Sequence, residues 1–158
     1  MKGADAKAFS WSRCPRSIQI FILAYVACVA FGAANSYLQF EFIRVRLMEM
    51  SQFGELPGDG WVYAMILFRA GIALAILAWV LLRYSLIGRL IVGAQLVGWI
   101  YGAPTAIGFL SSDKLAALPF LIAGLLSAVA VASLLVKSSR LWFAQKGMTL
   151  ADDLDSFS

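Results

Sequence analysis

The stretch WVYAMILFRAGIALAILAWVLLR, from Trp61 to Arg83, decides the class of this protein. A helix rises about 1.5 Å per residue, so the 21 residues from Val62 to Leu82 cover the roughly 30 Å of a bilayer's hydrocarbon core. Arg69 would lie about 10 Å below the end that Trp61 marks, inside one leaflet. The stretch therefore predicts a membrane-spanning helix with one embedded charge.

The composition of the whole chain agrees with a lipid environment. Of its 158 residues, 61% are hydrophobic and 14% are charged, whereas soluble domains have about 45–50% and about 25%. The formal net charge of +4 does not indicate a nucleic-acid partner, because the basic residues cluster beside apolar runs and form no stripe on a soluble face. We expect membrane lipids as the surroundings and no nucleic acid as a ligand.

Three further apolar runs predict spans at about 17–40, 90–110 and 118–136, in addition to 62–82. The expected fold is an all-α integral membrane protein, an up-and-down bundle of four transmembrane helices over 17–147. Residues 1–16 form a basic interfacial segment, and the acidic tail 148–158 is expected to be disordered. The first run could also be a signal peptide, but it is long for one, so we interpret it as an uncleaved span.

The distribution of basic residues predicts the orientation. If both termini and the turn at 83–89 share one side, that side holds nine of the 13 Lys and Arg residues. The other side holds Arg44, Arg46 and Lys114. The positive-inside bias then makes both termini cytoplasmic, and the compact loops, with no glycosylation acceptor, favour a bacterial inner membrane.

The segments outside the central spans carry several local signals. Whether 41–60 is helical stays open; if the first helix continues, Glu41 with Arg44, and Arg46 with Glu49, are spaced to pair at i,i+3. Pro104 should bend the third span, and Pro119 suits the first turn of the fourth.

The residue types needed for common enzymatic and metal chemistry are scarce. The chain has no histidine and two cysteines, Cys14 and Cys28, that do not form a Cys-x-x-Cys pair. No carboxylate lies deep in a predicted span, which leaves no acid/base pair there. We expect no enzyme, no metal and no cofactor. Cys14 stands beside the membrane, so acylation is an alternative role for it.

Arg69 is the centre of the candidate site. A charged arginine in hydrocarbon costs about 2.5–3.5 kcal/mol, so it should find water or a partner. The depth of the other polar residues predicts a polar layer in the same leaflet: Asn35, Arg69, Tyr101 and Thr105, with Glu41 nearer the surface. Three interpretations stay open, namely snorkelling or pairing with Glu41 or a loop acid, an anion site, and an ion pair with another subunit.

Small residues recur at four-residue spacing in every predicted span, which favours close helix packing. The glycines in these rows are Gly32, Gly71, Gly98, Gly102 and Gly124. Together with the missing catalytic groups, they favour a non-catalytic accessory, stabilising, inhibitory or immunity-type subunit that binds another integral membrane protein or a second copy of itself. The alternative is a small carrier or binder of an anionic or lipidic ligand through the layer around Arg69.

Overall fold

The computed structural model of the chain describes residues 11, 14–50, 58–83, 86–109 and 114–145, and all of its regular structure there is helical. The elements are α1 (Arg16–Leu38), α2 (Phe40–Met50), α3 (Asp59–Arg83), α4 (Leu86–Phe109), α5 (Lys114–Leu135) and α6 (Lys137–Ala144). The acidic tail and almost all of the basic amino-terminal segment lie outside the described residues.

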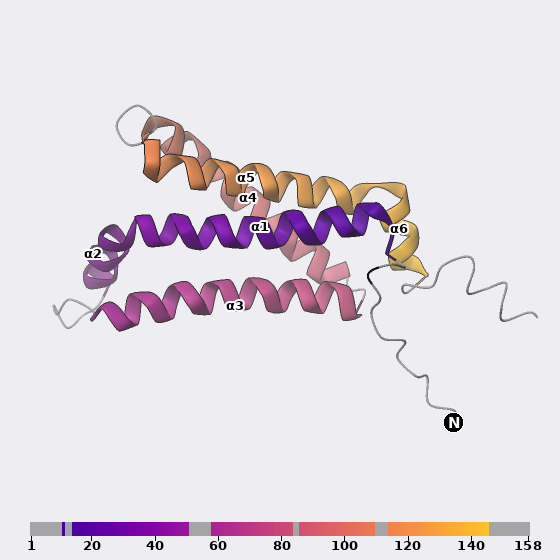
Figure 1. Ribbon diagram of the computed structural model, residues 1–158, viewed down its shortest axis with the longest axis horizontal. Coiled ribbons are helices and arrows are strands. Elements are labelled where there is room, and N and C mark those ends of the chain that lie inside the picture. The colour runs from indigo at the N-terminus through magenta and orange to yellow at the C-terminus, as the bar shows by residue number, and fades with distance from the viewer. Residues whose placement is uncertain (1–10, 12–13, 51–57, 84–85, 110–113, 146–158) are drawn as a thin grey trace, which may run out of the picture.

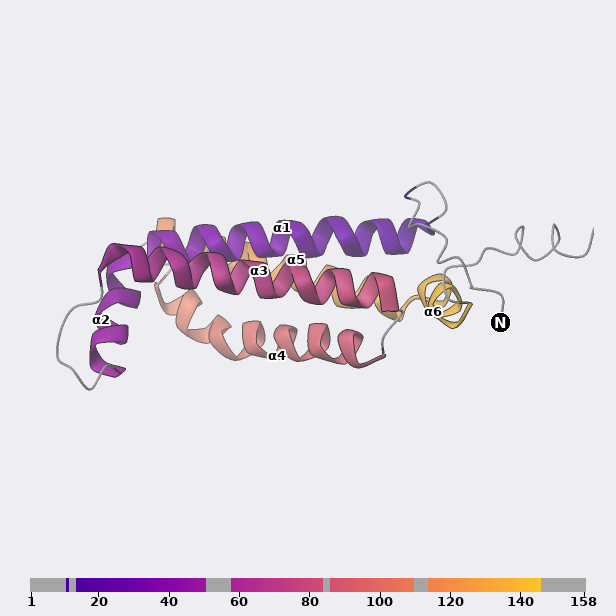
Figure 2. The same ribbon diagram turned by 90° about the horizontal axis from the view of Figure 1, so that it is seen from below.

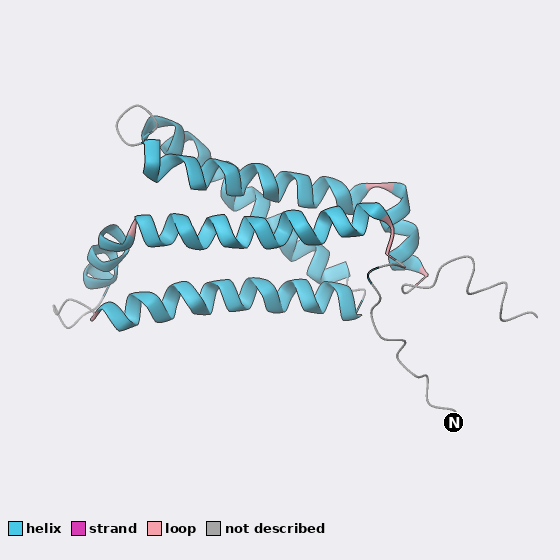
Figure 3. Cartoon of the chain, viewed as in Figure 1, coloured by secondary structure: helices cyan, strands magenta, loops and turns pink. Residues whose placement is uncertain are grey.

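Four of these helices, α1, α3, α4 and α5, are long and apolar enough to cross a membrane. The prediction of four apolar helices of membrane-spanning length is therefore confirmed, with ends that agree to about one helical turn. Successive long helices run in opposite directions, as Figures 1 and 3 show. α2 lies at one end of the bundle and α6 at the other, and we call these the α2 end and the α6 end.

Each short helix follows a single non-helical residue that ends the long helix before it. Gln39 separates α1 from α2, so the helix question left open for 41–60 is settled for residues 40–50. Val136 adopts an extended conformation (φ −63°, ψ 143°) between α5 and α6. Hydroxyl groups hold α6 in place: the Ser139 hydroxyl donates to the Ser133 carbonyl at 2.6 Å, and the Ser17 hydroxyl lies within hydrogen-bond distance of it at 2.8 Å.

The prolines of α4 and α5 lie inside their helices. Pro104 removes one backbone hydrogen bond of α4, and Figure 2 shows the carboxyl-terminal part of α4 turning away from the line of its first turns. The prediction for Pro119 was wrong, because α5 begins at Lys114 and places this proline beyond the first turn.

The packed core fills the α6 half of the bundle. α1 packs most extensively against α5, and α4 lies on the other side of α5. The largest fully buried side chains of this core are Ile18, Phe21, Val80 and Val92. They come from α1, α3 and α4, so the three helices are held together at this end.

Candidate functional site

On the side of this core that faces the α2 end, a cavity of about 610 Å³ lies between α1, α3 and α4. One residue of α5, Phe120, also lines it. The volume falls within the roughly 300–1,000 Å³ range of pockets that hold small organic ligands. The cavity combines this volume with a charged lining residue, Arg69, so it is the candidate site.

A hydrogen bond between two helices closes the lower end of the cavity, which is the end nearer the packed core and α6. The Tyr25 hydroxyl of α1 donates to Oε1 of Gln95 on α4 at 2.8 Å. Both residues line the cavity. The Gln95 Nε2 group has no partner among the described residues, so two N–H donors remain available.

The polar groups of the cavity continue along α1 and α3 toward the α2 end. The Ser36 hydroxyl donates to the Gly32 carbonyl at 3.0 Å, which leaves its oxygen able to accept a further bond. Arg69 of α3 lines the same cavity. Its guanidinium forms no ion pair or hydrogen bond with any described residue, and no carboxylate lines the cavity. Within the described chain, the site presents an uncompensated positive charge.

Trp99 of α4 gives the cavity a large apolar surface. Its ring meets Phe120 edge-on, with ring centroids 4.7 Å apart. A Cβ at Gly32 would lie 3.6 Å from the Trp99 ring, and one at Gly124 would lie 3.7 Å from its Cβ. Small residues on α1 and α5 therefore let this indole pack between them. Val29, Met65 and Phe68 add further apolar surface.

The predicted polar layer is brought together only in part. Arg69 lines the cavity, but Asn35, Tyr101 and Thr105 do not. Asn35 is buried, and its Oδ1 accepts a bond from Gln39 Nε2 at 3.4 Å. Tyr101 is 89% exposed, and Thr105 is also exposed. The depth of these residues was used without their direction: Tyr101 is two residues from Trp99, and two residues rotate a helix by about 200°.

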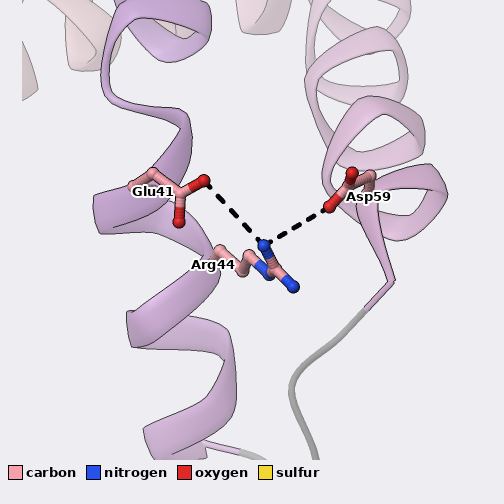
Figure 4. A network of polar contacts seen from close by, with 3 residues as sticks. All are labelled: Glu41, Arg44 and Asp59. Carbon is pink, nitrogen blue, oxygen red and sulfur yellow. Dashed lines mark ion pairs between the residues drawn. The ribbon is translucent and has the colours of Figure 1, made fainter.

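Glu41, the fifth residue of the predicted layer, belongs to a separate ion-pair network at the α2 end (Figure 4). Arg44 Nη1 lies 3.9 Å from Glu41 Oε1 and 3.6 Å from Asp59 Oδ1, and so connects α2 to the start of α3. The predicted i,i+3 pair of Glu41 with Arg44 is confirmed, whereas the side chains of Arg46 and Glu49 lie outside the described part. Glu41 is thus no partner of Arg69.

The five glycines predicted to pack helices fall into two groups. Gly32, Gly102 and Gly124 lie against other helices of the chain, and a Cβ at Gly102 would approach the Phe120 ring to 2.5 Å. Gly71 and Gly98 have nothing within 4 Å of an added Cβ. These two do not bring helices of this chain together; Gly98 lines the cavity and Gly71 faces outward.

The residues that sequence reasoning missed are Tyr25, Ser36 and Gln95. The sequence did contain a signal for the Tyr25–Gln95 pair. α1 and α4 both begin at the α6 end, and each of the two residues lies nine residues after the first residue of its helix, a rise of about 14 Å. Equal depth on two spans would have made them candidates for a pair. No group of three or more His, Cys, Asp or Glu side chains in the described residues could hold a metal ion.

No protein-family model, curated protein or solved structure matches this chain.

Proposed function

We propose that this protein binds an amphipathic anion, with an acidic head group at Arg69 and an apolar body against Trp99 and Phe120. The observation that carries the proposal is the cavity, in which Arg69 is the only charged lining residue of the described chain. Arg69 is exposed and has no partner within the described chain, and an arginine at this depth of a membrane-spanning helix favours an anion. Ser36 and Gln95 supply hydrogen bonds along the same wall.

The shape of the lining supports a ligand with a single apolar chain. The polar lining residues come from α1, α3 and α4, and the Trp99 and Phe120 rings add a paired aromatic surface to the same cavity. A cavity of about 610 Å³ suits a ligand of drug-like size, so a two-chain lipid would leave much of its apolar part in the bilayer. The proposed ligand class is therefore a fatty-acid-like anion.

Trp99 provides a direct test with dibromostearate, whose bromine atoms quench a nearby indole. We expect dibromostearate to quench the tryptophan fluorescence of the detergent-solubilised protein. The part of the quenching that is due to Trp99 should be absent in Trp99→Phe. Arg69→Gln should weaken the affinity for the acid about tenfold, or about 1.4 kcal/mol. The dibromostearate methyl ester, which has no charge, should bind the wild-type protein and Arg69→Gln equally.

Arg16→Gln is the matched control, since it removes one charge at the opposite end of the bundle. Equal affinities of Arg69→Gln and the wild-type protein for the acid would contradict the proposal. Quenching that persists unchanged in Trp99→Phe would place the ligand on the lipid-facing surface and contradict it too.

A second candidate function is an accessory subunit of a larger membrane complex, and the outward face of α3 favours it. Gly71 has nothing within 4 Å of an added Cβ, and Ala75 and Ala78, on the same face, are exposed. Such a row lets a partner helix approach closely. Native mass spectrometry after mild purification tests it: Gly71→Leu should remove a co-purified protein or second copy, and Ala128→Leu on α5 should not.

The orientation and location are parts of the same proposal. Nine of the 13 basic residues fall on the side of the two termini, which supports cytoplasmic termini. The proposal of a bacterial inner membrane rests on the compact loops and the missing glycosylation acceptor. The Arg69 cavity would then lie toward the outer leaflet. Labelling of single cysteines introduced at Lys137 and Asp59 with a membrane-impermeant maleimide in intact cells tests this, since only the second should react.

A further inference from the structure

The α6 end of the bundle carries a second concentration of positive charge, separate from the cavity. The cations described there are Arg16, Arg83, Arg89, Lys137 and Arg140. The acidic residues whose side chains are described, Glu41 and Asp59, both belong to the α2 end. No described carboxylate therefore neutralises the basic residues of the α6 end.

Arg89 differs from the other cations in being partly enclosed. Its guanidinium carbon lies 4.6 Å from the centroid of the Phe143 ring, within the range of a cation–π interaction. Its Nε is buried and has no hydrogen-bond partner. Leaving a buried donor without a partner is unfavourable. The described chain supplies no acceptor for the Arg89 Nε–H, so a ligand can supply one.

The surroundings hold Arg89 in place. A Cβ at Gly88 would come within 2.6 Å of the Val80 side chain, which shows how closely the first turn of α4 packs on α3. Below the guanidinium, Phe143 is 5% exposed and its neighbour Trp142 is 4% exposed. The aromatic support is thus part of the core and is not a loose surface contact.

The position of Arg89 along the bundle indicates the ligand. It lies three residues after the start of α4, about 5 Å from the helix end, which is the level of lipid head groups if α4 spans the membrane. Leu82, Leu86 and Leu90, all more than 60% exposed, offer an apolar surface beside it. Arg140, one helical turn before Phe143, is exposed and available to the same ligand.

We propose that Arg89, supported by Phe143 and flanked by Arg83 and Arg140, binds the phosphate of an anionic phospholipid in the leaflet at the α6 end. The guanidinium offers several donors in a fixed plane that matches phosphate oxygens. The acyl chains lie along the exposed leucines of α3 and α4. Basic pockets between transmembrane helices commonly bind acidic head groups in this way.

Charge-conserving substitutions separate a built site from a general basic surface. Arg89→Lys keeps the net charge and the topogenic signal but loses the planar guanidinium. Arg16→Lys is the matched control at the same end of the bundle. Each protein is released from nanodiscs that contain equal amounts of phosphatidylglycerol and phosphatidylcholine with identical chains, and the bound lipids are counted by native mass spectrometry.

We expect the wild-type protein and Arg16→Lys to retain phosphatidylglycerol in preference to phosphatidylcholine. In Arg89→Lys this preference should fall about tenfold, equivalent to about 1.4 kcal/mol, and Arg89→Gln should show at least the same loss. The ratio of the two lipids is read within each sample, so a change in protein stability does not imitate the result.

Two outcomes would overturn the proposal. An unchanged lipid preference in Arg89→Lys would show that the α6 end attracts anionic lipid through its general positive charge and not through the Arg89 guanidinium. A rise in melting temperature with inorganic phosphate alone, as large as that with phosphatidylglycerol, would assign the site to a soluble phosphate compound in place of a lipid.

Discussion

The hydroxyl of Tyr25 donates a 2.8 Å hydrogen bond to Oε1 of Gln95, joining α1 to α4 where the packed core meets the cavity. Tyr25 is 3% exposed, and its ring also packs on Phe21 at 5.8 Å between centroids. This bond therefore fixes the lower end of the cavity and connects its polar lining to the core.

Removing the Tyr25 hydroxyl should cost stability and loosen the cavity. We expect Tyr25→Phe to lower the free energy of unfolding by about 0.5–1.5 kcal/mol, measured by denaturation in mixed micelles. Tyr37→Phe, at an exposed position with no described hydrogen bond, is the matched control and should change little. A double-mutant cycle with Gln95→Leu should give a coupling of about 0.6 kcal/mol, the average for polar pairs between membrane helices. Additive effects would contradict a direct bond.

Gly102 controls the position of the Phe120 ring. A Cβ there would lie 2.5 Å from Phe120 Cζ, a contact that real side chains do not make. Gly102→Ala should therefore displace the ring and destabilise the protein by about 1–3 kcal/mol. Combining it with Phe120→Leu should recover part of this loss, because the smaller side chain frees the space. Gly98→Ala is the control, since nothing lies within 4 Å of its Cβ. A double variant less stable than both single variants would exclude this contact as the cause.

The four long helices could be predicted because each apolar run is as long as a bilayer is thick, a signal that length alone carries. The direction in which each residue faces could not. α3 and α4 are apolar on nearly all sides, so no stripe in their sequences shows which face meets another helix. Tyr101 and Thr105 were placed with Arg69 for this reason, although only the depth of these residues was known.

The breaks next to the spans were harder to predict for a different reason. Gln39 and Val136 are ordinary helix residues by propensity, and their non-helical conformations depend on what the following helix contacts. α6 turns where Ser139 reaches Ser133 and Ser17, residues from two other segments. Such contacts depend on the tertiary structure, and a local pattern does not contain them.

The ion pair between Arg44 and Asp59 should make a small contribution to stability, and this contribution should fall as the salt concentration rises. Asp59 has a side chain 64% exposed and lies 3.6 Å from Arg44, and exposed pairs contribute about 0.2–1 kcal/mol. We expect Asp59→Asn to speed amide hydrogen exchange in α2, because this helix loses its ionic attachment to α3. High salt should produce the same increase in the wild-type protein and none in the variant. Identical exchange in both proteins at low salt would show that the pair does not hold α2.

Cys14, which lies two residues before the start of α1, should be a slow nucleophile. It is 7% exposed, and burial raises the pKa of its thiol, so less thiolate, the reactive form, is present at neutral pH. In Cys28→Ser, where Cys14 is the remaining cysteine, iodoacetamide should react more slowly than with free cysteine at pH 8, and the rate should still be rising above pH 9. Rapid alkylation at pH 8 would show an accessible thiol and would revive acylation as a role for this residue.

The same raised pKa predicts the direction in which stability changes with pH. The folded state holds the Cys14 proton more tightly than the unfolded state, whose thiol titrates near about 8.5. The stability that the protonated, buried thiol contributes is therefore fully present below that pH. It is lost as the pH rises through the higher pKa of the folded state. Between Cys28→Ser and the double variant Cys14→Ala/Cys28→Ser, the difference in melting temperature should shrink as the pH is raised from 8 to 10. A difference that grows with pH would mean that the folded protein stabilises the thiolate, which requires a cation near Cys14 rather than an apolar environment.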